Sequence, residues 1–176
     1  RLEKLEADRK AQEAAQPRAA AAQQKAAAQQ KAAAKPATTA SAGVQVPGSW
    51  LCPVQGPHAF SDDYGDPRAG GRRHEGNDIL SPRGTPVVAP VPGNVRRHDN
   101  GAGGIAFYLD GSDGNQYYGA HLQSYAGVNG HVEQGTVIGY VGNTGDAAGG
   151  PTHLHFEIHP HGGAAVDPYR TLRQYC

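Results

Sequence analysis

Hydrophobic positions in the second part of the chain fall in short segments rather than in long amphipathic runs. From Trp50 onward, β-branched and aromatic residues alternate with turns of Gly, Asn and Asp, which is typical of β-strands. The run Asp113-Gly114-Asn115 predicts a hairpin turn. Because this part lacks an amphipathic helical stretch of ten residues, we expect an all-β domain with a compact antiparallel sheet, built as a sandwich or a barrel. The expected strands are 86–91, 94–97, 105–110, 115–122, 136–142 and 152–159.

The first part of the chain has a different pattern. Residues 1–35 are rich in Ala, Gln and Lys, and the sequence of 23–28 is repeated in 29–34. These residues favour a helix, but almost nothing in them can bury apolar area, so we predict a helical or coiled-coil tail or a solvated spacer. The Pro, Thr, Ser and Gly of 36–47 indicate a flexible linker. The expected domain is then 48–176.

Composition narrows the range of functions. The 16 Lys and Arg balance the 16 Asp and Glu, so no basic field favours nucleic acid, and we expect no nucleic-acid partner. The longest apolar run has about five residues, far fewer than the roughly 20 that a transmembrane helix needs, and we expect no transmembrane segment in this chain. The chain begins with Arg1 and contains no Met, so we expect a processed product or a piece that lacks any signal peptide.

Two cysteines, Cys52 and Cys176, bracket the expected domain. They lack the spacing of a thiolate metal site. A disulfide between them is the favoured interpretation, and two free thiols are the alternative. A disulfide requires an oxidising compartment, which favours export of the protein.

Histidines and acidic residues form three groups along the chain. The first is H-x-G-x-D at His74 and Asp78, and the second is His153-Leu154-His155 in an expected strand. Alternation along that strand puts both imidazoles on one face, about 7 Å apart. The third group is His121, which follows an aromatic strand. Taken singly, each group fits a salt bridge, a polar surface or an ordinary histidine.

Together these groups could form a zinc site. Catalytic zinc needs three protein ligands and an open position for water. His74, Asp78 and one histidine of the 153/155 pair would supply that set, while the others would move protons. The remaining histidines are interpreted as surface residues, with His159 in a surface loop. They are His58, His98, His131, His159 and His161.

The order of motifs resembles the LytM or lysostaphin-type zinc metallopeptidases, which cut peptides of the bacterial cell wall. The resemblance runs from about residue 53 to residue 172. The stretch 61–68 resembles the family's S-x-x-G-x-R segment but has one extra residue before Arg68, so no role is assigned to that arginine. The matching landmarks are H-x-G-x-D at 74–78, GTPVVA at 84–89, GNV at 93–95, YGAHL at 118–122, VEQGTVIG at 132–139, GNTG at 142–145, HLHFE at 153–157 and VDP at 166–168.

The resemblance implies that His74, Asp78 and His155 bind one Zn²⁺ ion and that His121 and His153 are the catalytic pair. It leaves open which of the pair is the general base. The implied function is a zinc endopeptidase acting on cross-links or stem peptides of peptidoglycan, in a secreted or cell-envelope location.

Two alternatives stay open beside this function. One is a catalytically silent envelope scaffold that activates another cell-wall hydrolase, since such proteins also carry a coiled coil before the domain. The other is a metal-free sugar-binding or small-molecule module. For residues 1–35, a coiled-coil or other envelope protein is the partner to consider.

Overall fold

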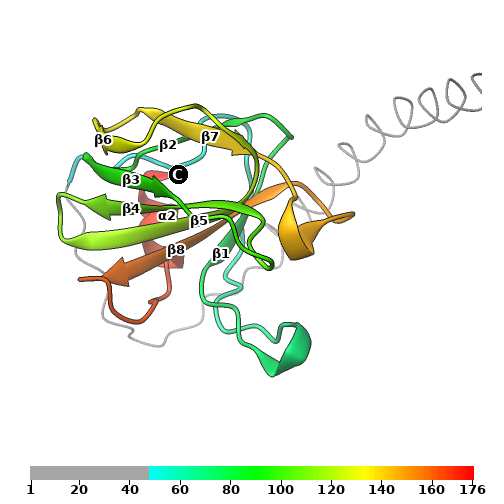
Figure 1. Cartoon of the computed structure of the whole chain (residues 1–176). Helices are drawn as coiled ribbons and strands as arrows, with labels where there is room; N and C mark the ends of the chain where they lie inside the picture. Colours follow the sequence, from blue (N-terminus) through cyan, green and yellow to red (C-terminus); the bar gives the residue numbers. More distant parts are fainter. Residues whose placement is uncertain (1–47) are drawn as a thin grey trace, which may run out of the picture. The chain divides into compact units, whose positions relative to one another are not determined.

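The computed structural model of the chain describes residues 48–176, so the expected tail 1–35 and linker 36–47 lie outside the described residues. The domain boundaries given above therefore stay predictions. Eight strands, two short 3-10 helices and one α-helix make up the described part (Figure 1). The strands are β1 (Asn77–Leu80), β2 (Pro86–Val88), β3 (Gly93–Arg97), β4 (Ile105–Gly111), β5 (Asn115–Tyr125), β6 (Gly130–Val132), β7 (Val137–Val141) and β8 (His153–Pro160). The helices are η1 (Ala69–Gly71), η2 (Gly145–Ala147) and α2 (Tyr169–Tyr175).

All strand pairs are antiparallel, which confirms the expected all-β fold. The main order is β1-β8-β5-β4-β3-β6, and β7 pairs with both β5 and β2. The 11-residue β5 is the centre of the sheet, because it pairs with β4, β8 and β7. The predicted hairpin connects β4 and β5, and Gly114 takes a φ of 83° there, a conformation that glycine adopts at low cost.

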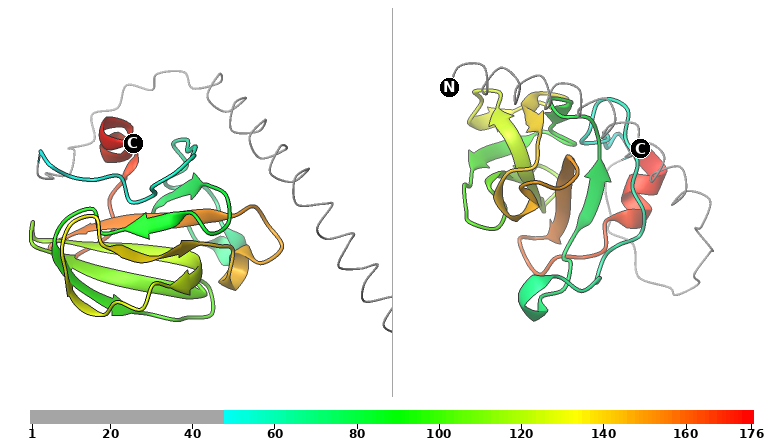
Figure 2. Two further views of the ribbon diagram at one scale, coloured as in Figure 1. Left: turned by 90° about the horizontal axis from the view of Figure 1, so that it is seen from above. Right: turned by 90° about the vertical axis from the view of Figure 1, so that its right-hand side faces the viewer.

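One face of the sheet is packed and the other is open. Residues on the packed face alternate along β4, β5 and β8, as Leu109, Tyr117 and Phe156 illustrate, and all three are completely buried. Trp50 covers this face and donates a hydrogen bond from Nε1 to the Tyr117 hydroxyl at 3.1 Å. Helix α2 lies on the same side (Figure 2, left), where Leu172 is buried in the core.

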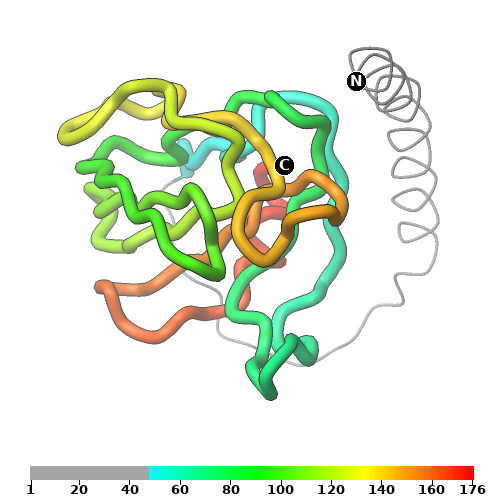
Figure 3. Tube along the Cα trace, turned by 45° about the vertical axis from the view of Figure 1, so that its right-hand side comes forward, coloured from blue at the N-terminus to red at the C-terminus, as the bar shows by residue number. Residues whose placement is uncertain are grey.

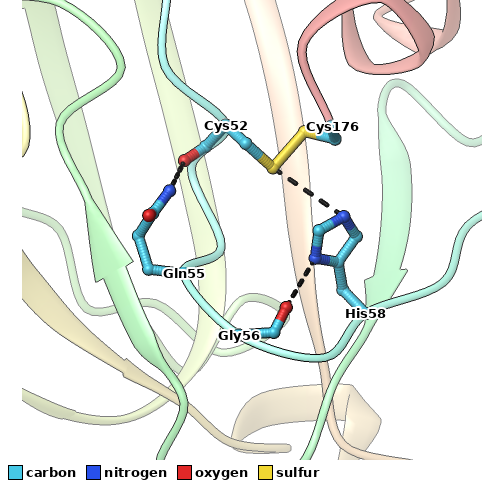
Figure 4. Close-up of a disulfide and its surroundings, with 5 residues drawn as sticks. All are labelled: Cys52, Gln55, Gly56, His58 and Cys176. Atoms are coloured by element: carbon cyan, nitrogen blue, oxygen red, sulfur yellow. Dashed lines mark hydrogen bonds between the residues drawn. A yellow bond between two sulfur atoms is a disulfide. The ribbon is translucent and has the colours of Figure 1, made fainter.

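The two ends of the described part are joined covalently. Cys52 and Cys176 form the expected disulfide (Figure 4), which ties the segment before β1 to the end of α2. His58 lies beside it, with its Nδ1 atom 2.7 Å from the carbonyl oxygen of Gly56.

Two strands and the helix were not predicted from the sequence. Strand β1 contains the polar pair Asn77 and Asp78, and β6 has only three residues, so neither has a clear alternating pattern. The seven residues of α2 are too few for a distinct helical period. Among residues 48–176, no helix has the length and apolar character that crossing a bilayer requires.

Candidate metal centre and active site

The pairing of β1 with β8 brings together two of the predicted ligands. Asp78 lies directly opposite His155 in the register of these strands. Directly opposite residues have Cβ atoms about 4.5–5.5 Å apart. Along β8, Leu154 and Phe156 are fully buried on one side, so His153 and His155 share the other side, as the alternation predicted. Glu157 lies on the same side.

His74 reaches the same point from the loop before β1. Its backbone N–H donates to the carbonyl oxygen of Asp66 at 2.9 Å, and its side chain is only 3% exposed. Gly76 lets this loop pass close to β8, because a Cβ there would collide with the backbone oxygen of Phe156. The glycine of the H-x-G-x-D motif thus has a steric reason.

The three predicted ligands converge on one point through one atom each. Nε2 of His74 lies 2.8 Å from Nδ1 of His155. Each of these nitrogens lies 3.0 Å from Oδ1 of Asp78. The three atoms therefore form a nearly equilateral triangle between loop, β1 and β8.

In each histidine ring, the hydrogen-bond partner of the nitrogen that points away from the triangle decides which nitrogen carries the proton. Nδ1 of His74 lies 2.9 Å from the Asp63 carbonyl oxygen, which can only accept a hydrogen bond, so Nδ1 carries the proton. Nε2 of His155 lies 2.7 Å from a Glu157 carboxylate oxygen. With a proton on each of these outer nitrogens, the neutral rings present lone pairs to each other and to Asp78.

Three acceptor atoms in mutual contact need a cation between them. A tetrahedral zinc site with bonds of about 2.0–2.1 Å would have edges of about 3.3 Å, slightly longer than the 2.8–3.0 Å seen here. Two imidazole nitrogens and a carboxylate oxygen, each supported by an outer hydrogen bond, are donors that zinc prefers. The residues therefore fit a single divalent ion.

Without a metal ion, protons on the histidines hold the three acceptor atoms together. Burial lowers the pKa of His74, but hydrogen bonds with Asp63 and Asp78 outweigh it and raise the pKa to about 10. For His155, burial also lowers the pKa, but hydrogen bonds with Asp78 and Glu157 outweigh burial and raise it. For Asp78, burial favours the neutral form, yet hydrogen bonds from His155 and His74 hold its pKa below the ordinary value.

His121 and His153 lie beside the triangle with their ring centroids 4.9 Å apart. Nδ1 of His121 is 2.8 Å from the Thr144 carbonyl oxygen, and Nδ1 of His153 is 2.9 Å from that of Pro151. Both rings therefore carry a proton on Nδ1, which leaves Nε2 able to accept one. Nε2 of His153 is 3.8 Å from Oδ1 of Asp78.

The backbone and surroundings of His121 are unusual. Its φ of 64° places a non-glycine residue in the left-handed region inside β5, a strain that proteins keep mostly at functional positions. Burial, followed by the nearby His153 ring, lowers the pKa of His121. The imidazole is therefore neutral at pH 7, as a proton acceptor must be.

Arg68, which received no role from the sequence, touches the triangle. Its Nη2 donates to Oδ2 of Asp78 at 2.7 Å, and lies 3.5 Å from Oδ2 of Asp63. The guanidinium thereby occupies the outer oxygen of Asp78 and leaves Oδ1 directed at the histidines. The sequence alone does not show the effect of the extra residue before Arg68, because the path of the loop determines where the guanidinium lies.

Sequence reasoning also missed the role of His159. This residue lies inside β8 rather than in a surface loop, and its Nε2 is 2.6 Å from Oε2 of Glu157. Glu157 thus joins His155 to His159. Continuing the alternation of β8 by two more pairs of residues would have placed Glu157 and His159 on the ligand face.

An open cleft of about 380 Å³ is lined by the three predicted ligands together with His121, His153, Arg68 and Glu157. The cleft lies at the end of the sheet that is surrounded by three loops, 61–76, 98–104 and 142–152 (Figure 3). Arg72 of the first loop forms an ion pair with Asp146 of the last, with 3.2 Å between Nη2 and Oδ2.

This fold and site define a class. An antiparallel β domain with two imidazoles and a carboxylate converging in an open cleft is typical of metal-dependent hydrolases, whose three protein ligands leave a position for water. The chain belongs to peptidase family M23, which matches residues 72–168. The resemblance to LytM and lysostaphin-type peptidases is thereby confirmed.

Individual relatives agree with this family. The L-Ala--D-Glu endopeptidase of Bacillus subtilis is 34% identical over 137 residues, which are 70% of this chain and 42% of that protein. The DD-carboxypeptidase/endopeptidase Mpg of Neisseria meningitidis is 37% identical over 92 residues, 52% of this chain and 21% of that protein. The chain thus spans less than half the length of these curated relatives.

Solved structures show the same fold. The catalytic domain of lysostaphin from Staphylococcus simulans is 29% identical, with a TM-score of 0.58 over 66% of this chain and 92% of that one. A mutant catalytic domain of the prophage-encoded M23 protein EnpA from Enterococcus faecalis is 27% identical, with a TM-score of 0.56 over 69% and 97%.

Proposed function

We propose that this chain is a zinc endopeptidase that hydrolyses peptide bonds in the cross-links or stem peptides of peptidoglycan. Family membership and the activities named for its relatives support a peptidase acting on the cell wall. The observation that carries the proposal is the convergence of one atom each from His74, Asp78 and His155 on a common point.

In this proposal, Nε2 of His74, Oδ1 of Asp78 and Nδ1 of His155 hold the ion. Zinc bound there would polarise the scissile carbonyl and lower the pKa of its water to about 7. Asp63 and Glu157 hold the two rings with their lone pairs directed inward. Such outer partners fix ring orientation and make the ligands more basic.

His121 and His153 are the proposed catalytic pair. Each has an Nε2 atom that is free to accept a proton, because backbone carbonyls hold its Nδ1–H. One imidazole would take the proton from the attacking water, and the other would donate a hydrogen bond to the oxyanion that develops on the carbonyl. His121, whose pKa is lowered by burial, is our candidate for the base.

Metal content and peptide release test the proposal on the full chain. We expect the purified protein to carry one zinc per chain and to release peptides from isolated cell-wall sacculi. His155→Ala should lose both zinc and turnover, whereas His153→Ala should keep the zinc and lose turnover. His131→Ala is the matched control, because His131 is exposed and pairs only with Glu133 at the surface.

Two outcomes would overturn it. Full zinc binding by His155→Ala would refute the ligand assignment. Zinc in the native protein without release of any peptide would favour the scaffold that activates another hydrolase.

Location outside the cytoplasm belongs to the same proposal. The Cys52–Cys176 disulfide suits an oxidising compartment, and peptidoglycan lies in the envelope. Pairing of residues 1–35 with an envelope protein stays a prediction.

A further inference from the structure

A row of large side chains crosses the open face of the sheet, starting at the candidate active site. Glu157 of β8 lies opposite Tyr118 of β5, Tyr118 opposite Tyr108 of β4, and Tyr108 opposite Arg96 of β3. With neighbouring strands about 4.8 Å apart, these four positions span about 14 Å. The row therefore reaches from the ligand strand almost to the far edge of the sheet.

The side chains of this row pack against one another, with the rings tilted by 42° between Tyr108 and Tyr118 and by 59° between His98 and Tyr108. The guanidinium of Arg96 lies 4.5 Å from the centre of the Tyr108 ring. The rings of Tyr108 and Tyr118 are 5.0 Å apart, and the ring of His98 is 4.8 Å from that of Tyr108. We call Arg96, His98, Tyr108 and Tyr118 the sheet platform.

The platform is continuous with the cleft. Tyr118 is one of the residues that line it, and its ring centre lies 6.1 Å from that of the ligand His155. Arg96 and His98 are exposed, and both tyrosines are half-buried. A molecule whose reactive end lies in the cleft can thus extend over the platform without leaving the surface.

Polar groups border the platform toward both ends of its strands. Asp110 accepts a hydrogen bond from Nε2 of Gln116 at 2.7 Å, and Nε of Arg96 lies 3.6 Å from Oδ2 of Asp110. Asn100 donates from Nδ2 to the Tyr118 hydroxyl at 3.1 Å. The surface therefore combines aromatic rings with a positively charged guanidinium, a negatively charged carboxylate and neutral amide groups.

We propose that the sheet platform binds the glycan strand of peptidoglycan while an attached peptide occupies the cleft. A pyranose ring has a C–H face that stacks on aromatic rings and an edge of hydroxyl and acetamido groups that bond to Arg, Asp and Gln. The row is long enough for two linked sugar rings. This inference rests on the proposed function, since it takes the peptidoglycan peptide as the occupant of the cleft.

A protein partner suits this surface less well. Stable protein interfaces bury about 800 Å² on each partner and have apolar centres. Within residues 48–176, Tyr64 is the one large hydrophobic residue that is exposed, and it lies outside the platform. The platform offers aromatic rings with polar borders rather than an aliphatic patch.

Paired substrates test the inference. Cleavage of a free stem peptide is compared with cleavage of the same peptide attached to its disaccharide, using the full chain with zinc. For Arg96→Ala, we expect the KM for the disaccharide-linked peptide to rise about three- to tenfold, as for one lost hydrogen bond, and the free peptide to be cut as before. Arg97→Ala is the matched control, because Arg97 stacks on Tyr125 outside the platform, at 4.7 Å.

Direct binding separates this inference from the proposed function. Peptide-free glycan strands should bind the full chain, and Arg96→Ala and Tyr108→Leu should each weaken that binding by a similar factor while Arg97→Ala does not. This measurement needs no turnover, so it decides the inference even if the chain cuts no peptide. A Tyr108→Leu variant with an unchanged thermal midpoint shows that the fold is kept.

Three results would overturn the inference. One is equal loss of activity on both substrates, which would indicate a general effect on the cleft. Another is unchanged binding of glycan strands by Arg96→Ala and Tyr108→Leu, which would limit these residues to stabilising the sheet. The third is binding of the free peptide, but not of the glycan, to the platform.

Discussion

Breaking the Cys52–Cys176 disulfide should cost the fold a large part of its stability while leaving the cleft intact. The bridge closes a loop with a sequence separation of 124 residues. In the chain-entropy relation, a loop of that length contributes about 5 kcal/mol at 25 °C, because the cross-link removes conformations from the unfolded chain. Domains have about 5–15 kcal/mol of stability in total. Reduction should thus lower the thermal midpoint by roughly 15–20 °C for a domain of this size.

The protein carries its own reporter for this measurement. Trp50 is the single tryptophan, is 3% exposed and lies two residues from Cys52. Urea unfolding followed by its fluorescence would give the free energy of unfolding of oxidised and reduced protein with no change of sequence. The slope m should rise on reduction, because the uncross-linked unfolded state exposes more surface.

The cleft supplies the control. Neither cysteine lines it. Reduced protein that is still folded at low temperature should therefore bind zinc as the oxidised form does once its thiols are alkylated, because Cys52, Cys176 and His58 lie close enough to hold a metal themselves. A loss below about 2 kcal/mol, with full reduction verified by thiol titration, would refute the reasoning that this bridge limits the unfolded chain.

Three further predictions concern the candidate site. Glu157→Gln should weaken zinc binding about 10- to 100-fold, measured by competition with a chelator; equal affinity would contradict the role of Glu157. The pKa of metal-free His74 is raised to about 10, so this residue must lose a proton when zinc binds. Zinc affinity should therefore rise between pH 6 and 8, by up to about tenfold per pH unit for each proton released. A zinc affinity that does not change with pH in the same chelator competition would argue against this. Gly76→Ala should displace the His74 loop, because its Cβ would collide with the Phe156 oxygen, and should lower both zinc affinity and thermal midpoint, whereas Gly48→Ala, with open space around it, should change neither.

Much of the fold was predictable because its strands have local signals. Six of the eight strands carry enough β-branched or aromatic residues to be recognised, and Gly114 marks the central hairpin. Strand β1 was missed because Asn77 and Asp78 are chosen for contacts with other parts of the chain. Asn77 is fully buried and donates from Nδ2 to Ser61 and Asp63, which no local pattern indicates.

Some residues of the candidate site were likewise predictable from local patterns, and others depend on tertiary contacts. His153 and His155 were placed on one face by alternation alone, and the motif order grouped them with His74 and Asp78. Arg68 and Asp63 lie in the stretch 61–68, which resembles a family segment. The path of this loop depends on tertiary contacts, so the sequence alone does not place either residue against the ligands. The proline and two glycines that follow His159 indicate a loop, but β8 continues through Pro160.

Anomalous diffraction at the zinc edge from crystals of the zinc-loaded chain would test the central claim most directly. We expect a single strong peak bounded by Nε2 of His74, Nδ1 of His155 and Oδ1 of Asp78, at about 2.0–2.2 Å from each. A peak held by other side chains, or zinc that leaves any of these three atoms outside its coordination sphere, would contradict it.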